Sequence, residues 1–266
     1  MRLSFINYNK MSNDGLTVIS HIYNEEYLLP FWLEHHRSIF KNGIIIDYNS
    51  TDRSREIIYE YCPHWKVVQS ENHMFEAQAV DREVMRIESS IPGYKIALNT
   101  TEFLMISTEE VFPDGLNCLN IPIINAVSSK DNIFPNTLAE FFSGIEKIVP
   151  TYSDVVYRGH HRFMHNYSNG QYSVGRHGTS LSGSSNSINA AVLWVGMYPW
   201  NSETVKRKMG IKVRISNSDK IQGFGYQHQW SEEQCYALKN EFFRAGVDIY
   251  DLPEPLKQLL IDIVQK

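Results

Sequence analysis

The chain has 266 residues, of which 42% are hydrophobic, 21% charged and 12% aromatic, and its formal net charge is -5. A chain of this length buries roughly 70 to 75% of the surface that its unfolded form exposes, so we expect one globular domain that needs no disulfide or metal to hold it together. The composition excludes disordered, collagen-like and coiled-coil chains, and 25 basic against 30 acidic residues do not favour nucleic acid as a partner.

Cysteine use and hydropathy suggest a compartment. The three cysteines, Cys62, Cys118 and Cys235, lie far apart and form no paired motif, which argues against a structural zinc site or a disulfide framework. No apolar run reaches the ~18 residues of a membrane span, and the first ten residues lack the apolar core of a signal peptide. The sequence therefore predicts a cytoplasmic protein with no transmembrane segment.

The first hundred residues alternate between strand-like and helix-like segments. We expect strands at 16–23, 43–48, 65–69 and 94–98, where short runs are rich in β-branched and apolar residues. Between them, apolar residues recur at helical spacing over 25–40, between the polar run 49–52 and Pro63, and over 75–89. Such alternation is typical of an α/β fold with right-handed crossovers, a mostly parallel central sheet and flanking helices.

Beyond residue 105 this regularity is lost. We expect a strand at 116–127, a helix at 136–149, an apolar stretch at 188–200 after a Gly/Ser-rich loop, and an amphipathic helix at 253–266. Because there is no internal repeat and no clean linker, we expect a single domain over 1–266. Its parts are a regular half at about 14–105, an irregular half at about 106–230 and C-terminal helices within 231–266.

Polar clusters follow all four strands of the regular half. They are residues 24–26, 47–52, 70–72 and 99–102. In a parallel sheet these clusters gather along the carboxyl edge, which is where open α/β sheets bind their ligands. Ordinary loop polarity is the alternative explanation. The chain has no G-x-G-x-x-G after its first strand, no Walker loop and no G-x-S-x-G elbow, which disfavours dinucleotide oxidoreductases, P-loop enzymes and α/β-hydrolases.

Three of these clusters contain motifs in the order and spacing of the GT-A glycosyltransferase fold. Tyr23-Asn24-Glu25 follows the first strand, residues 47–52 read Asp-Tyr-Asn-Ser-Thr-Asp, and residues 99–103 read Asn-Thr-Thr-Glu-Phe. Over about 105 residues the chain resembles the family 2-like branch found in bacteria and large viruses. The corresponding motifs of that branch read Tyr-Asn-Glu, Asp-Asp-Gly-Ser-Thr-Asp and D-x-D-Glu-Phe.

The resemblance implies a GT-A type fold with a Rossmann-like nucleotide-sugar-binding half at about 14–105 and an acceptor half at about 106–230. It also implies an inverting transfer of a hexosyl or deoxyhexosyl group from a nucleoside diphosphate sugar, which we interpret as UDP-linked, to a glycan or glycoconjugate hydroxyl. The alternative is a degenerate protein that binds a nucleotide sugar or a glycan without turnover.

By the same resemblance, Asp47 contacts the base or ribose and Tyr23 forms a pocket wall. Tyr48 stands where the family often has a second aspartate, and we expect it to stack on the base instead. The alternative for Asp47 is a carboxylate that caps the following helix. The other donor-site residues expected from the motifs are Asn24, Glu25, Asn99 and Thr101.

The motif after the fourth strand departs from the family. Asn99 and Thr101 replace both aspartates of D-x-D, and Glu102 is the only carboxylate left in the tetrapeptide. Divalent cations paired with phosphates prefer anionic oxygens, so a Mn²⁺ or Mg²⁺ site here is weakened. Either Glu102 and the distant His228 bind the cation with help from the diphosphate, or cationic side chains neutralise the leaving group without a metal.

Arginine suits phosphate oxygens because its planar guanidinium donates two parallel hydrogen bonds. We expect Arg82 and Arg176 to contact the diphosphate, with a surface salt bridge as the alternative for Arg82. The basic run of Lys206, Arg207 and Lys208, with Lys212 and Arg214, is interpreted as a solvated face, and an anionic acceptor or a membrane surface is the alternative.

The catalytic base is left open by the sequence. Inverting transfer requires a carboxylate or an imidazole within hydrogen-bond reach of the acceptor hydroxyl. Three residues of the acceptor half have suitable side chains: Asp154, His161 and Glu203.

Overall fold

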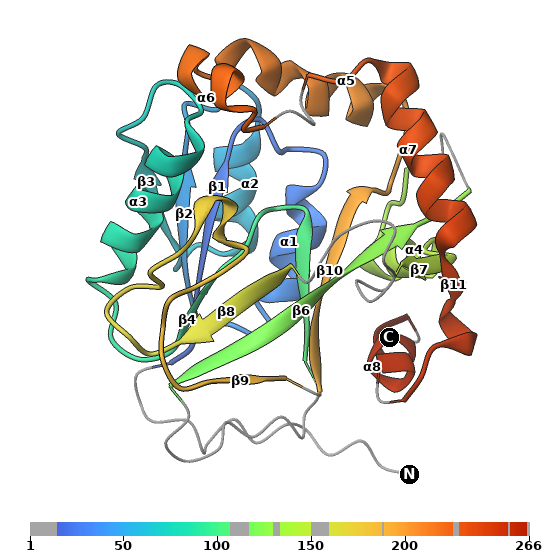
Figure 1. Cartoon of the computed structure of the whole chain (residues 1–266), viewed down its shortest axis with the longest axis horizontal. Coiled ribbons are helices and arrows are strands. Elements are labelled where there is room, and N and C mark those ends of the chain that lie inside the picture. The colour runs from blue at the N-terminus through green and yellow to red at the C-terminus, as the bar shows by residue number, and fades with distance from the viewer. Residues whose placement is uncertain are drawn as a thin grey trace.

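The computed structural model describes residues 15–106, 117–129, 134–149, 160–187, 189–225, 229–254 and 256–264. One sheet runs through these residues in the strand order β11-β7-β6-β8-β4-β1-β2-β3, with β5, β9 and β10 attached to it (Figure 1). The predicted class, an α/β fold with a mostly parallel central sheet and flanking helices, is confirmed.

The regular half contains the parallel part of the sheet, in which β3, β2, β1 and β4 lie side by side. All four predicted strands and all three predicted helices are present. Their bounds are β1 Thr17–Ile22, α1 Leu29–His36, β2 Asn42–Asp47, α2 Ser54–Tyr61, β3 Lys66–Gln69, α3 Ala77–Glu88 and β4 Lys95–Ala97. Helix α1 begins at Leu29 rather than near residue 25, and Pro30 stands in its first turn, where a missing N–H costs nothing.

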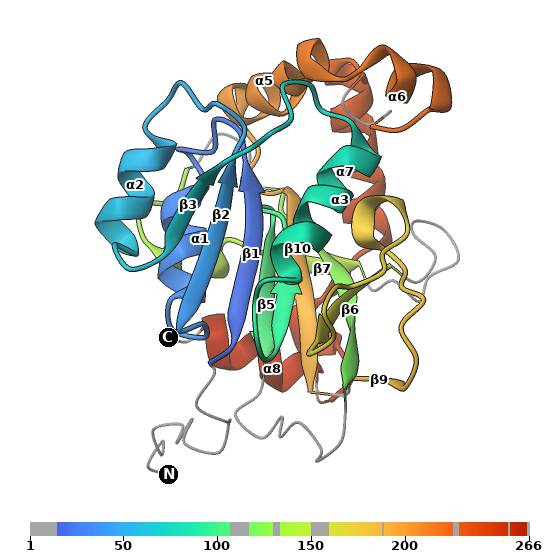
Figure 2. The same cartoon turned by 90° about the vertical axis from the view of Figure 1, so that its left-hand side faces the viewer.

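Alternating side chains of β1 and β2 bury both faces of this sheet. Val18 and Ile45 pack in the core that also contains residues of α1 and α2, whereas Ile19 and Ile46 pack with the apolar face of α3. This follows from the two-residue period of a strand. Figure 2 shows α2 and α3 on opposite sides of the strands.

The irregular half continues the sheet with mixed directions. Strand β8 is antiparallel to both β4 and β6, and β10 is parallel to β6 but antiparallel to β5. The bounds of these elements are β5 Glu102–Ile106, β6 Cys118–Val127, α4 Leu138–Ser143, β7 Lys147–Val149, β8 His161–His165, β9 Ser184–Asn186 and β10 Ala190–Met197.

The remaining elements follow β10 in the chain. They are α5 Ser202–Gly210, the short 3-10 helix η3 Ile211–Arg214, α6 Asn217–Gln222, α7 Glu232–Ala245, β11 Val247–Asp248 and α8 Leu256–Val264. Helices α5 and α6 lie at the top of both views, on the side of the molecule where the parallel strands end (Figures 1 and 2). None of the helices that the structure describes is both long and apolar enough to span a membrane.

The prediction of a single helix at 136–149 is wrong. The segment forms the short helix α4, which ends before Gly144, and then strand β7, which pairs with β6 and β11. Phe141, Phe142 and Ile145 are buried as expected. The apolar spacing fits a helix, but the backbone of Lys147–Val149 finds partners in β6, a strand more than twenty residues earlier, which local spacing does not reveal.

Candidate functional site

A cavity of about 420 Å³ lies where the carboxyl ends of β1, β2 and β4 meet the segment from β10 to η3. We call it the strand-end pocket. Its walls consist of the loops after those three strands, the start of α3, the turn at residues 175–177, the end of β10 and residues of α5 and η3. Of the four polar clusters expected to gather at this edge, those after β1, β2 and β4 contribute residues to this single cavity, whereas residues 70–72 after β3 do not line it.

Seven of the nine predicted donor-site residues line this pocket. They are Tyr23, Asn24, Glu25, Tyr48, Asn99, Thr101 and Arg176. Two of them, Asn24 and Arg176, have positive φ angles of 53° and 58°, a backbone conformation in which asparagine is common and arginine is rare.

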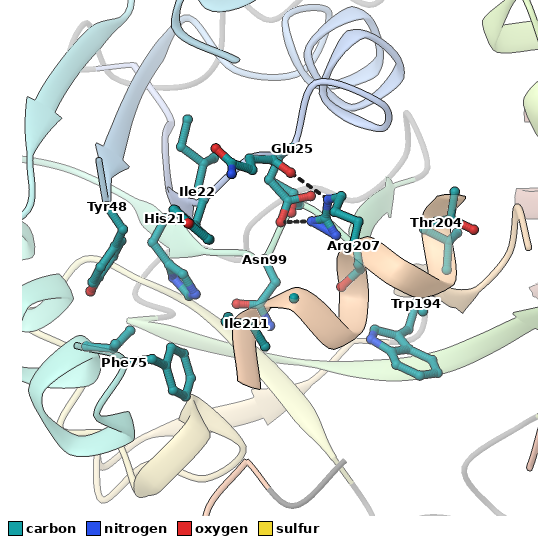
Figure 3. A pocket seen from close by; sticks show the side chains of 18 of the residues that line it. His21, Ile22, Glu25, Tyr48, Phe75, Asn99, Trp194, Thr204, Arg207 and Ile211 are labelled. Atoms are coloured by element: carbon teal, nitrogen blue, oxygen red, sulfur yellow. Dashed lines mark hydrogen bonds and ion pairs between the residues drawn. The ribbon is translucent and has the colours of Figure 1, made fainter. Parts of the chain in front are cut away.

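The pocket has an aromatic wall at each end. Tyr48 and Phe75 stand beside His21 at one end, and Trp194 stands near Thr204 at the other, with Asn99 between them (Figure 3). The Tyr48 hydroxyl donates a 3.0 Å hydrogen bond to Glu83, which also accepts bonds from Ser70 and Asn72. These bonds fix the ring of Tyr48 at the pocket wall.

Two arginines of the α5–η3 segment reach across to the strand ends. Arg207 donates from Nε to the carbonyl oxygen of Asn24 at 2.6 Å, forms an ion pair with Glu25, and lies 4.2 Å over the ring of Tyr27 (Figure 3). The second oxygen of Glu25, Oε2, is buried and accepts no hydrogen bond from the described residues.

Arg214 occupies the equivalent place beside β2. It donates to the carbonyl oxygens of Tyr48 at 2.6 Å and His73 at 3.0 Å, and it lies 4.2 Å over the ring of Tyr23. Because carbonyl oxygens carry only partial charge, these contacts orient the guanidinium without neutralising it. Within the described chain, no carboxylate forms an ion pair with Arg214.

The third arginine of the pocket, Arg176, lies in the 3-10 turn Val174–Arg176. Its guanidinium donates to Asp81 Oδ1 at 2.8 Å and to Asn99 Oδ1 at 2.7 Å. The other oxygen of Asp81 accepts the backbone N–H of Gly175 at 2.7 Å. The turn is thus held against the start of α3.

The described lining carries a net positive charge. It contains Arg176, Arg207 and Arg214 against Glu25 and Asp81, which leaves a balance of one positive charge. The two lining histidines add none at neutral pH, because burial and, after it, nearby arginines lower the pKa of His21 and of His177 to about 3. The pocket therefore favours an anionic ligand.

Asp47 lies outside this lining, which corrects its expected place. It is fully buried, and its carboxylate accepts the N–H of Ser50 at 2.9 Å and pairs with Arg55 at 3.0 Å. These bonds shape the loop after β2, in which Asn49 has a φ of 61°. The carboxylate thus holds the loop that leads into α2, but it is not the helix cap considered as the alternative, because the N-cap position of α2 is Arg53 and the N–H of Ser54 is accepted by Asp52.

Two other predicted residues are also not brought to the pocket. Arg82 is exposed on α3 and lies 3.7 Å from Glu76, which matches the surface salt bridge considered for it. His161 lies on β8, paired with β6, and does not line the cavity. Glu203 falls on α5, although its side-chain position is not described, and Asp154 and His228 lie outside the described residues.

The largest correction concerns Glu102, which we expected to bind a metal ion. Only 1% of its surface is exposed, it does not line the pocket, and both of its oxygens are bound by Arg162 at 2.6 and 2.8 Å. Burial alone would raise the pKa of this carboxyl, but the charge and hydrogen bonds of Arg162, followed by the N–H of Asn99, bring the pKa below its ordinary value. The cation beside Glu102 is therefore a guanidinium.

The expectation that the basic run forms a solvated face is only partly correct. Lys206 and Lys212 are exposed, as a solvated face requires, whereas Arg207 and Arg214 point to the pocket. The two arginines are seven residues apart, one on α5 and the other at the end of η3, and both line the pocket. That spacing is the signal in the sequence that could have singled them out.

No protein-family model matches the chain, and no curated protein matches it by sequence. Among solved structures, it is similar to S. aureus TarS 1–349 in complex with UDP-GlcNAc, with 14% identity over 93% of this chain and 79% of that one and a TM-score of 0.42. It is also similar to HddC from Yersinia pseudotuberculosis, with 8% identity over 73% and 97% of the two chains and a TM-score of 0.41.

A third similar structure is glucosyl-3-phosphoglycerate synthase from Mycobacterium tuberculosis in complex with Mn²⁺, UDP and glucosyl-3-phosphoglycerate. The identity is 12% over 42% of this chain, the TM-score is 0.32, and the match spans 44% of the synthase. These likenesses concern the fold, and with TM-scores below 0.5 they do not by themselves assign an activity.

Proposed function

We propose that the protein is a glycosyltransferase that moves a sugar from a nucleoside diphosphate sugar, UDP-linked, to a hydroxyl of a glycan or glycoconjugate, with inversion at the anomeric carbon. The observation that carries this proposal is the strand-end pocket itself. It offers an aromatic wall at each end and a net positive charge, and it lies at the carboxyl edge of a parallel sheet. A flat base matches the aromatic wall at one end, a diphosphate matches the positive charge, and a sugar ring matches the aromatic wall at the other end.

The base belongs at the end formed by Tyr48 and Phe75. An aromatic ring held by its hydroxyl, as Tyr48 is by Glu83, presents a fixed face for stacking. The neutral His21 beside it has a buried Nδ1 without a hydrogen-bond partner in the described structure, which is available to a polar edge of the base.

The diphosphate belongs near Arg176, Asn99 and Arg214. Arg214 carries a full charge that no described carboxylate balances, and its guanidinium is already oriented by two carbonyl oxygens. Positive groups placed in advance where the leaving diphosphate gains charge lower the barrier of the transfer without reorganisation.

The sugars belong at the Trp194 end of the pocket, which Trp200 also lines. Sugar rings lie well on apolar aromatic faces. Oε2 of Glu25 has no hydrogen-bond partner among the described residues, whereas each oxygen of Asp81 already accepts one bond, so Glu25 is the acceptor that we assign to a sugar hydroxyl.

A binding experiment tests the proposal. UDP should raise the melting temperature of the protein, because a ligand that binds only the folded state stabilises it by mass action. Arg214→Ala should weaken UDP binding by about tenfold or more, as expected for hydrogen bonds to a charged group, and leave uridine binding unchanged. Arg53→Ala, which removes an exposed arginine paired with Glu56 and Glu60, is the matched control.

A non-catalytic binding protein is the second candidate. It is favoured by one observation, namely that each carboxylate of the described lining, Glu25 and Asp81, forms an ion pair with an arginine. Release of free nucleoside diphosphate from a panel of nucleotide sugars distinguishes the two candidates. Binding of a nucleotide sugar without any hydrolysis or transfer would support the binding protein.

A further inference from the structure

The altered motif after β4 forms part of a closed network of hydrogen bonds. Glu102 accepts four: two from Arg162, at 2.6 and 2.8 Å, and two from Asn99, through its backbone N–H and its side-chain amide, both at 2.9 Å. Glu102 and Arg162 are each only 1% exposed. Both carboxylate oxygens thus have the bonds that a buried carboxylate requires.

The residues present do not fit a divalent cation. A metal at Glu102 would have to displace a buried guanidinium that binds the carboxylate through two parallel bonds. Of the pocket's two carboxylates, Asp81 has both oxygens bonded, to Arg176 and to the N–H of Gly175, and Glu25 pairs with Arg207 through Oε1 while its Oε2 has no partner among the described residues. Among the described residues, no group of three or more histidine, cysteine, aspartate or glutamate side chains is placed to hold a metal.

Asn99 explains why an amide suits this place better than the carboxylate of the D-x-D pattern. Its Nδ2 donates to Glu102, and its Oδ1 accepts from Arg176 at 2.7 Å. An aspartate could accept from Arg176, but it has no proton to donate to Glu102 and would bring a second negative charge within hydrogen-bond distance of it. The amide therefore links the buried ion pair to the pocket arginine.

Arg162 continues the network to the turn that carries Arg176. Its third nitrogen, Nη1, donates to the carbonyl oxygens of Gly175 at 2.9 Å and of Arg176 at 2.8 Å. Gly175 and Arg176 have φ angles of 78° and 58°. For arginine that conformation is strained, and it persists only where the surroundings hold it in place. Arg162 thus positions the backbone from which Arg176 reaches the pocket.

We propose that a network of hydrogen bonds replaces the divalent cation at this motif, an inference that rests on the proposed function. The network consists of Glu102, Arg162, Asn99 and Arg176. Arg176 faces the diphosphate, and Arg162 is a positioning residue that acts through the turn. Nucleoside diphosphate binding then requires no metal. Arg176 keeps one buried donor, Nε, without a partner among the described residues, which is available to a phosphate oxygen.

Calorimetry of UDP binding, with the protein in excess EDTA and then in MnCl₂, tests this inference. The dissociation constant should change by less than about threefold, well below the ~10- to 100-fold loss that follows even indirect damage to a metal site. Binding in MnCl₂ but not in EDTA would overturn the inference and leave the proposed function standing. Failure of UDP, GDP, CDP and ADP to bind in either condition would instead contradict the proposed function.

Two variants separate positioning from simple structural support. Arg162→Lys keeps the charge but cannot bind two carboxylate oxygens and two carbonyls at once, so UDP binding should weaken by about tenfold or more while uridine binding stays unchanged. An equal loss for UDP and uridine would show that Arg162 only stabilises the fold. Arg53→Lys, on an exposed pair, is the control.

The double substitution Asn99→Asp with Thr101→Asp restores the carboxylates of D-x-D. We expect UDP binding to weaken, with no rescue by MnCl₂, because the new carboxylate at position 99 lies against Glu102, whose oxygens remain bound to Arg162. If Mn²⁺ instead restores UDP binding to the level of the parent, the site still fits a metal and the inference is wrong.

Discussion

The two walls of the strand-end pocket are built in different ways. The strand-loop wall, formed by the loops after β1 and β2, is braced by hydrogen bonds between its two loops: Ser50 and Ser54 accept the N–H groups of Asn24 and Glu25 at 3.0 and 2.8 Å. The α5–η3 wall instead reaches over through two long side chains, Arg207 and Arg214. One wall therefore holds its own shape, whereas the other depends on its contacts with the first.

This difference assigns different tasks to the two walls. Short side chains, which lose less rotamer entropy on folding than long ones, shape the strand-loop wall together with main-chain groups. Long cations supply the charge from the α5–η3 wall and from the turn at Arg176. Changes in the strand-loop wall should therefore affect stability first, and changes to the arginines of the opposite wall should affect anion binding first.

The largest effect is expected at the buried pair that joins the two halves of the chain, Glu102 on β5 and Arg162 on β8. Glu102→Gln or Arg162→Met alone should lower the free energy of unfolding by about 3 to 5 kcal/mol, because each leaves an uncompensated buried charge. The double variant should lose much less. Urea unfolding of all three measures this, and additive losses in the double variant would show that the two side chains do not depend on each other.

Asp47 tests the strand-loop wall. Asp47→Ala should lower the free energy of unfolding by about 1 to 3 kcal/mol, since the half-buried N–H of Ser50 loses its acceptor and Arg55 loses its buried partner. UDP affinity should change less than in Arg214→Ala. Glu56→Ala, an exposed carboxylate on the following helix, is the control. A stable Asp47→Ala protein that no longer binds UDP would return Asp47 to the nucleotide contact expected from the sequence.

Lowering the pH should reduce the free energy of unfolding before the carboxylates begin to bind protons. Burial lowers the pKa of His21 and His177 to about 3 and brings that of His36 well below its ordinary 6.5. Between pH 6.5 and 3 the unfolded chain therefore binds more protons than the folded one, so stability falls as the pH is lowered from 7.

Each fully neutral buried histidine contributes a slope of at most about 1.4 kcal/mol per pH unit. Urea unfolding at pH 7, 6 and 5 measures the slope, and His21→Phe should reduce it. His36 gives the physical reason most directly, since its Nε2 accepts the N–H of Leu104 at 3.1 Å and cannot do so when protonated. A slope that is unchanged in His21→Phe would mean that His21 titrates normally in the folded state.

The smallest effect is expected at the α6 end of the segment that carries Arg214. Ser216 caps α6 by accepting the N–H of Asp219 at 3.0 Å, and Asp219 in turn accepts the N–H of Ala77 at 2.7 Å. Ser216→Ala should cost about 1 kcal/mol of stability. Ser218→Ala, on the exposed face of the same helix, is the control, and equal losses in both would exclude a capping role for Ser216.

Much of the fold could be predicted from the sequence because its regular half obeys local rules. The two-residue period of β1 and β2 and the helical spacing in α2 and α3 depend on neighbours along the chain, and each strand is followed directly by its polar cluster. Tyr23, Asn24 and Glu25 could be placed in the pocket for this reason, without knowledge of any distant residue.

The partners of those residues were decided only by the tertiary structure. Arg207 binds Asn24 across 183 positions of sequence, and Arg162 binds Glu102 across 60. The sequence shows that the motif after β4 has lost its aspartates, but not that a guanidinium from β8 is bound to the glutamate that remains. Which charged groups pair depends on their distance in space and on their burial, and local sequence spacing predicts neither. The cation beside Glu102 could therefore be identified only from the tertiary structure, in which β8 lies beside β4.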